Sequence, residues 1–265
     1  MYISKHFNIS GFKNRQQAFL YHLLFSVLLA GSILLFAKVA WYPNQLMFAT
    51  GAIKIFLLVI FVDACFGPLL TLVIYNLKKD AKELKRDFSV IVLLQLCALV
   101  YGTYTLIGGR PVYYVFAVDR FELVQANDIP ESFLVAKDAG QYAVLPKSGP
   151  QWVYAELPED IGERNDVLFT QVNHGIDLAQ TPKYYQPLSE GRETILKKIR
   201  PLDVLYTTND KDRVDQALES LDLSLVSDFG YLPLAGKKAD LIVVMNKVTM
   251  KIAGVVDLNP WQDSE

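Results

Sequence analysis

Long apolar runs alternate with short polar segments over the first 110 residues of the chain. They cover residues 19–40, about 53–75 and 88–107. The first run opens with nineteen residues that include no Asp, Glu, Lys or Arg, and as a helix this stretch is about 28 Å long, enough to cross a hydrocarbon core. The second run contains one acid and the third contains no charge. This pattern predicts three transmembrane helices within residues 19–110.

Beyond residue 110 the apolar positions come in shorter stretches, typical of a soluble domain. Stretches rich in aromatic and β-branched residues predict strands. Acidic residues or a serine at the beginning of a polar stretch predict the start of a helix. We expect strands at 111–118 and 151–157, helices at 158–173, 189–200 and 209–221, and a final hairpin over 240–258. The expected fold is three transmembrane helices followed by an α+β domain over 111–265, which is long enough to bury its own core.

Charge separates the same two parts. The 265 residues are 52% hydrophobic, yet the chain holds 26 Lys and Arg and 28 Asp and Glu. Residues 1–110 carry a net positive charge and 111–265 a net negative charge. An acidic domain without clustered Lys and Arg argues against nucleic-acid binding. Both cysteines, Cys65 and Cys97, lie in apolar runs, so the sequence predicts neither a disulfide framework nor a cysteine zinc site.

The distribution of Lys and Arg predicts the orientation in the membrane. The tail at 1–18 and the loop at 76–87 are basic, whereas the loop at 41–46 has no basic residue. Under the positive-inside rule the N-terminus is cytoplasmic and the domain after residue 110 lies outside. The first run is not followed by a small-x-small cleavage site, which favours a retained helix over a cleaved signal peptide.

Polar residues within the apolar runs are the first candidate site. Asp63 lies about 18 Å from the cytoplasmic edge of the second span, and on the third span Tyr101 lies at about 20 Å and Gln95 at about 11 Å. We expect Asp63 to hydrogen-bond Tyr101 or to be held neutral by its surroundings, and Pro68 after Gly67 to kink the second span. Either these residues form a polar clasp between helices, or they sense a proton or a partner. The clasp is favoured, since the sequence places no second carboxylate or histidine at the depth of Asp63.

Motifs for catalysis are scarce in the domain. His174 is the only histidine there, and the sequence has no GxSxG, GxxxxGK[ST] or HExxH motif. The run Asp210-Lys211-Asp212 lacks the spacing of a calcium loop. The sequence therefore predicts a protein that is not an enzyme and has no cofactor and no metal site.

Several short motifs, in order along the chain, resemble the type IV pilin accessory protein family of the TfpX/TfpZ type. They comprise Trp41-Tyr42-Pro43, Asp63 with Gly67-Pro68-Leu69-Leu70-Thr71-Leu72, Gln95 with Tyr101-Gly102, the segment from Arg110 to Phe121, Pro182-Lys183-Tyr184-Tyr185-Gln186-Pro187 and Asp257-Leu258-Asn259-Pro260-Trp261. The chain departs from the family at Asn246-Lys247-Val248-Thr249, where a glycine is expected in the hairpin turn.

The resemblance implies a multi-pass protein of the bacterial inner membrane with a periplasmic domain. It implies a non-enzymatic accessory factor that assists assembly, stability or dynamics of a cognate major pilin, and it carries over no catalytic residue. Tyr184 and Tyr185 are candidates for a periplasmic partner contact, with local core packing as the alternative. The rival hypothesis is a membrane-anchored sensor or regulator with a periplasmic ligand-binding domain, against which the short cytoplasmic segments argue. The sequence makes no prediction of oligomeric state.

Overall fold

The computed structural model describes residues 14–43, 45–75, 80–135, 137–223 and 226–261. The chain forms two compact units, one made of residues 1–38 and 53–107 and the other of residues 39–52 and 108–265. Most of the predicted cytoplasmic tail and the lysines Lys78 and Lys79 lie outside the described residues. Each unit is described by itself below.

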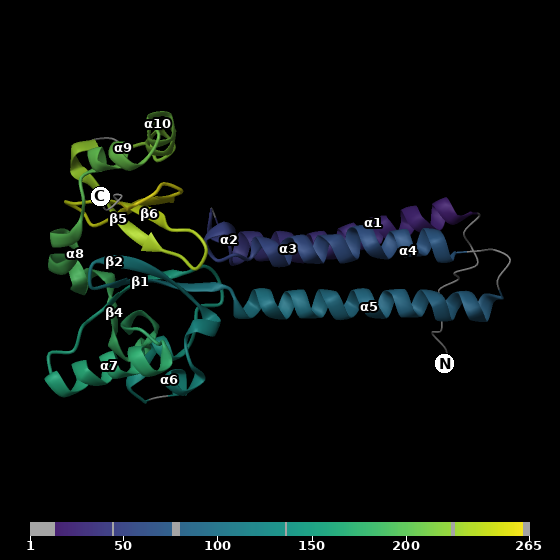
Figure 1. Cartoon of the computed structure of the whole chain (residues 1–265), viewed down its shortest axis with the longest axis horizontal. Coiled ribbons are helices and arrows are strands. Elements are labelled where there is room, and N and C mark those ends of the chain that lie inside the picture. Colours follow the sequence, from purple (N-terminus) through teal and green to yellow (C-terminus); the bar gives the residue numbers. More distant parts are fainter. Residues whose placement is uncertain (1–13, 44, 76–79, 136, 224–225, 262–265) are drawn as a thin grey trace, which may run out of the picture. The chain divides into compact units, whose positions relative to one another are not determined.

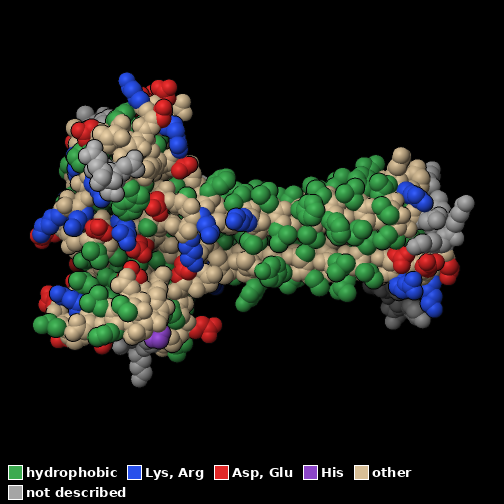
Figure 2. Space-filling model, in the orientation of Figure 1, with side chains coloured by type: hydrophobic (Ala, Val, Ile, Leu, Met, Phe, Trp, Pro, Cys, Tyr) green, Lys and Arg blue, Asp and Glu red, His purple; other side chains and the backbone are tan. Residues whose placement is uncertain are grey.

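Among the residues that the structure describes, the first unit contains three helical spans, each long and apolar enough to cross a membrane, which confirms the predicted number (Figure 1). The first is α1, Arg15–Ala40. The second combines α3 Ile53–Ile60, the π-helical segment η2 Phe61–Phe66 and α4 Gly67–Ile74. The third is α5, Ala81–Gly108, which begins seven residues earlier than predicted. Hydrophobic side chains cover the visible face of these helices (Figure 2), as expected for a surface in contact with lipid.

The predicted irregularity of the second span takes the form of a π-helix. Pro68 has no N–H, so it cannot continue the backbone ladder. The ladder shifts one residue before it, and Gly67 N–H bonds the carbonyl of Val62, five residues back. In that register the carbonyl of Asp63 would need the missing N–H of Pro68. One backbone acceptor in the middle of the span must therefore find a partner on another helix.

The second unit is built on a mixed sheet, which confirms the expected α+β architecture. Its described strands are ordered β4-β3-β1-β2-β5-β6-β7. The β1·β3 and β2·β5 pairs are parallel and the other pairs are antiparallel. The strands are β1 Pro111–Ala117, β2 Arg120–Gln125, β3 Gln151–Ala155, β4 Tyr185–Pro187, β5 Phe229–Ala235, β6 Leu241–Asn246 and β7 Ile252–Val256.

Short helices connect these strands, and the predicted helices are among them. Acidic caps start two of them: Asp160 accepts from Glu163 N–H at the start of α7, and Asp210 accepts from Asp212 N–H at the start of α10. The α-helices of this unit after β2 are α6 Glu131–Val135, α7 Ile161–His174, α8 Arg192–Lys198, α9 Leu205–Thr208 and α10 Lys211–Glu219.

The segment between the first two spans belongs to the sheet unit. It contains α2, Leu46–Ala49, whose Leu46 and Ala49 are buried in the same core cluster as Phe116 and Phe121. Lys238 N–H, in the β5–β6 connection, donates to the carbonyl of Ala49 at 2.9 Å. Residues 39–52 group with residues 108–265 in one compact unit, and Leu46 and Ala49 fill part of its core.

The β6–β7 hairpin turns without a glycine. Asn246 Oδ1 accepts hydrogen bonds from Val248 N–H and Thr249 N–H, at 2.9 and 2.8 Å. The positive φ falls on Met250, at 60°. The loop is longer than the two-residue turn for which glycine would be expected, and an asparagine side chain organises it.

Candidate functional site

Gln95 is the centre of a polar cluster inside the helical unit. Its side-chain Oε1 lies 2.8 Å from His22 Nε2 on α1. Its Nε2 donates to Ser26 Oγ at 3.3 Å and to the carbonyl of Asp63 at 3.1 Å. One amide therefore joins α1, the π-helical segment of the second span and α5. Such interhelical bonds fix the register and rotation of packed helices in a bilayer.

His22 is held through both nitrogens of its ring. Gln95 Oε1 can only accept, so His22 Nε2 carries the hydrogen. The other ring nitrogen, Nδ1, lies 2.6 Å from Thr71 Oγ1, and the Thr71 hydroxyl also donates to the carbonyl of Gly67 at 3.2 Å. Thr71 lies in α4, eight residues after Asp63, so the cluster runs along about two turns of the second span.

The local sequence of the second span explains how Gln95 reaches it. The carbonyl of Asp63 loses its backbone partner at Pro68, and Gln95 Nε2 supplies the missing donor. Gly67 provides the space, because a Cβ at this position would lie 2.2 Å from Gln95 Nε2 and 2.3 Å from Cδ. The predicted residues Asp63, Gly67, Pro68 and Gln95 thus come together.

Tyr101 does not join them. Its side chain is 60% exposed on α5, and the structure describes no hydrogen bond between it and Asp63. Gln95, which was expected to lie closer to the cytoplasmic edge than Asp63, instead reaches the carbonyl of Asp63 and so lies at the same level of the helices. Sequence reasoning also missed His22 and Ser26. Every fourth residue of α1 from Ala18 to Leu34 is buried, and this spacing of Ala, His, Ser, Ala and Leu was the available signal.

One oxygen of the Asp63 carboxyl group has no partner among the described residues. The residue is only 4% exposed, and this oxygen is its Oδ2. It lines a cavity of about 740 Å³ whose walls come from α1 and α5. Buried residues such as Ala18 and Ala30 form its floor, whereas Phe25 and Leu93 on its edge are exposed. The cavity is therefore a groove that opens on the apolar outer surface of the helices.

The two tyrosines singled out in the domain lie differently. Tyr185 is 3% exposed, packs in a core cluster and donates from its hydroxyl to the carbonyl of Ala179. Tyr184 is half-buried, with the ammonium of Lys183 5.2 Å from its ring centroid. Tyr185 thus follows the core-packing alternative, and Tyr184 is the one that retains accessible surface for a partner.

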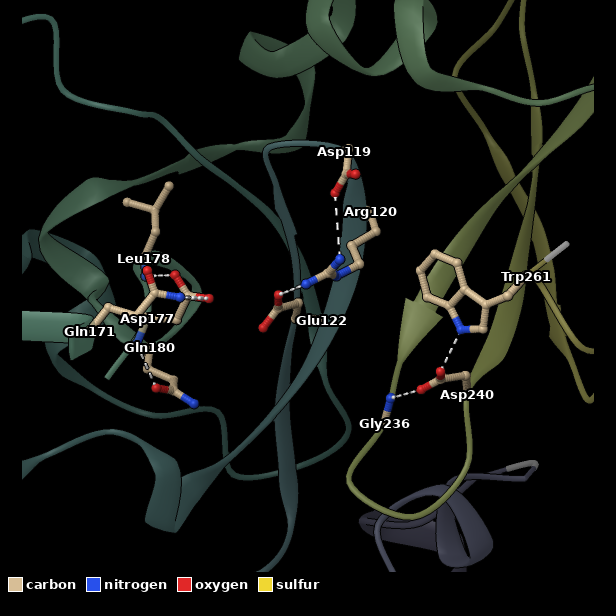
Figure 3. Close-up of polar contacts among 10 residues, drawn as sticks. All are labelled: Asp119, Arg120, Glu122, Gln171, Asp177, Leu178, Gln180, Gly236, Asp240 and Trp261. Atoms are coloured by element: carbon tan, nitrogen blue, oxygen red, sulfur yellow. Dashed lines mark hydrogen bonds and ion pairs between the residues drawn. The ribbon is translucent and has the colours of Figure 1, made fainter. Parts of the chain in front are cut away.

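The C-terminal segment is held against the sheet unit by many polar contacts. Trp261 Nε1–H donates to Asp240 Oδ2 at 2.6 Å, and Asp240 Oδ1 accepts from Gly236 N–H at 3.0 Å (Figure 3). The guanidinium groups of Arg120 and Arg200 lie 6.0 and 5.7 Å from the centroid of the Trp261 ring. These contacts anchor the segment, and they bring Arg120 and Trp261, which belong to two separate motifs of the resemblance, close together.

Near it, Arg120 lies between two acids of the β1–β2 hairpin, Asp119 and Glu122, at 3.8 and 3.5 Å (Figure 3). Burial raises the pKa of Glu122, the nearby Asp177 adds to the rise, and Arg120 opposes it. Within the described ranges no three His, Cys, Asp or Glu side chains are grouped closely enough to hold a metal ion.

Together, the fold and the cluster define a membrane protein in which three apolar helices share an internal polar network and carry an α+β unit. A fimbrial assembly protein, serogroup I, of Dichelobacter nodosus is 30% identical over 248 residues, or 92% of this chain and 93% of that protein. The serogroup E1 protein of the same organism is 29% identical over 245 residues, or 91% and 94%. The chain belongs to this family of fimbrial assembly proteins.

A third relative, the fimbrial assembly protein of serogroups C1 and C2, is 40% identical over 111 residues, which is 42% of this chain and 82% of that protein. No family model matches the chain. No solved structure matches it.

Proposed function

We propose that the protein is a non-enzymatic accessory factor of type IV pilus biogenesis, of the TfpX/TfpZ type, that assists assembly, stability or dynamics of a cognate major pilin. The observation that carries this proposal is the similarity to fimbrial assembly proteins over 92% of the chain, which includes both the helical unit and the sheet unit. A similarity of that extent supports a shared role for the whole architecture and not for one module alone.

The proposal places the protein in the bacterial inner membrane, with the N-terminus in the cytoplasm and the sheet unit in the periplasm. The basic residues Lys82, Lys85 and Arg86 at the start of α5 support this orientation under the positive-inside rule. Its partners are the bilayer and the pilin, and it binds no nucleic acid.

Physically, the helical unit suits lateral contact with another membrane helix. Small residues, Ala18, Ser26 and Ala30, allow close approach on the groove floor of α1, and the polar cluster fixes the helices that form the groove. In the periplasm, Tyr184 offers an amphipathic side chain of the kind that is enriched at protein interfaces.

The test uses a strain that makes the cognate pilin, with the full-length protein tagged and its gene deleted in a parallel strain. We expect the deletion to lower the number of surface pili or the level of pilin, and mild crosslinking in intact membranes to retain pilin with the tagged protein. Unchanged pili together with no retained pilin would refute the proposal. Capture of a small ligand or a signalling protein instead would favour the sensor hypothesis.

A further inference from the structure

We infer that the groove between α1 and α5 is the docking site for one transmembrane helix of the partner, and that this helix donates a hydrogen bond to Asp63. The inference rests on the proposed function, in which the partner is the pilin, and it adds the place and the chemistry of the contact.

The first argument is the unpaired carboxyl oxygen. Asp63 is 4% exposed and lines the groove, and its buried Oδ2 has no hydrogen-bond partner among the described residues. Every other polar side chain of the cluster is satisfied: His22 contacts Thr71 and Gln95, and Gln95 also bonds Ser26. A buried acceptor without a partner in apolar surroundings is costly, so a donor that reaches Asp63 from the groove would stabilise the site.

The second argument is depth. Asp63 lies ten residues from Ile53 and eleven from Ile74, so about 15 Å of helix separates it from either end of its span. A lipid headgroup does not reach that depth, and an acyl chain would fill the groove without offering a donor. A helix with a hydroxyl, amide or other donor near its middle provides both apolar surface and the hydrogen bond.

The third argument is the shape of the groove. Its volume of about 740 Å³ accommodates several side chains, its floor is lined by small residues, and its edge carries the exposed apolar side chains of Phe25 and Leu93. This combination of small floor and large apolar edge is typical of surfaces on which transmembrane helices pack.

The experiment places the photoreactive residue p-benzoyl-phenylalanine at Phe25 or Leu93, on the groove, in the full chain in native membranes that contain the pilin. Matched controls carry the probe at Leu28 and Leu94, which lie on the same two helices, are also exposed, and do not line the groove. We expect pilin to crosslink through its apolar helix at the two groove positions and far less at the controls.

Variants of Asp63 test the hydrogen bond. Asp63→Ala removes the acceptor and should lower the crosslinking yield about three- to twentyfold, the effect of one interhelical hydrogen bond. Asp63→Asn keeps an acceptor oxygen and should retain most of the yield. Ala30→Leu, which fills the groove and leaves Asp63 intact, should also lower the yield, so the inference can be tested if Asp63→Ala fails to accumulate.

Equal yields at all four positions, crosslinks to a second copy of this chain or only to lipid, or yields insensitive to Asp63→Ala would each overturn the inference. Further probes at Ile161 and Val172, which are exposed apolar residues of α7 in the sheet unit, distinguish a failure of the groove inference from a failure of the proposed function. Capture of pilin at these positions but at none of the groove positions would support the proposed function and refute the groove as the docking site.

Discussion

Replacing Gly67 by alanine should break the polar cluster without removing any polar group. The backbone at Gly67 is helical, with φ −61° and ψ −52°, so alanine meets no conformational penalty there. Its Cβ, however, would lie 2.2 Å from Nε2 and 2.7 Å from Oε1 of Gln95, so the amide must move away. All three hydrogen bonds of Gln95 would then be lost together.

The size of the effect follows from those bonds. Interhelical hydrogen bonds in membranes contribute on average about 0.6 and at most about 1.7 kcal/mol each. Three of them amount to roughly 2 to 5 kcal/mol, and the higher helix propensity of alanine returns about 1 kcal/mol. We therefore expect Gly67→Ala to lower the free energy of unfolding by about 1 to 4 kcal/mol.

The assay is unfolding of the full-length protein from mild detergent micelles by added SDS, followed by circular dichroism. Gly31→Ala is the matched control, because Gly31 is also a membrane-helix glycine but has nothing within 4 Å of the added Cβ. It should be neutral or slightly stabilising. A double-mutant cycle completes the test: in a Gln95→Ala background, Gly67→Ala should lose its cost.

Unfolding of Gly67→Ala at the same SDS fraction as the wild type would refute the reasoning, since it would show that Gln95 bonds elsewhere or that its bonds add nothing to stability. A cost that persists in the Gln95→Ala background would also refute it, because the clash would then lie with another residue.

Three further predictions concern the sheet unit in the full-length protein. Trp261→Ala should destabilise it by about 1 to 3 kcal/mol, because Trp261 is partly buried and also donates a hydrogen bond to Asp240. Asp240→Asn should destabilise it by less. Thermal unfolding measures both effects, and unchanged stability of Trp261→Ala would show that the C-terminal segment is not an anchor. Glu122→Gln should stabilise the unit at pH 7 and lose this advantage near pH 4. Burial raises the pKa of Glu122 in the folded protein, so ionisation of this carboxyl group opposes folding once the pH exceeds its pKa in the unfolded chain. Burial, with a smaller effect of Tyr142, raises the pKa of Tyr113 to about 12, so the stability of the unit should fall as the pH rises from about 10 to 12. Unfolding measured over this alkaline range, with Tyr113→Phe as the comparison, checks this. An identical loss of stability in the variant would contradict it.

The sequence predicted those parts of the fold that have strong local signals. The three spans, β1, β3, the capped helices and the final hairpin are of this kind. The strands β2 and β5 were missed. Arg120 and Glu122 make β2 look polar, although the two side chains pair with each other, and Gly230 and Pro233 interrupt the strand pattern of β5. Their place in the sheet depends on neighbouring strands and not on local preference.

The candidate site was predicted in part for a similar reason. Asp63, Gly67, Pro68 and Gln95 stand out because polar residues, glycine and proline are unusual in an apolar run, and they do meet. Which residue partners which depends on where α5 begins and on the π-helical shift, and neither is visible in the residue pattern. In the sequence, His22 is a polar residue in an otherwise apolar helix. Its hydrogen bond with Gln95 depends on how α1 packs.

The segment at 39–52 also ties the order of synthesis to the order of folding. Leu46 and Ala49 leave the ribosome long before β5 and β6, yet they occupy the same core cluster as Leu234 and Leu241. The core of the sheet unit therefore cannot be completed until β5 and β6 are made, and until then the apolar side chains of the segment between the first two spans stay uncovered. A recombinant fragment that starts at residue 111 would lack these side chains, so an expression vector for the isolated domain should restore residues 39–52 through a linker.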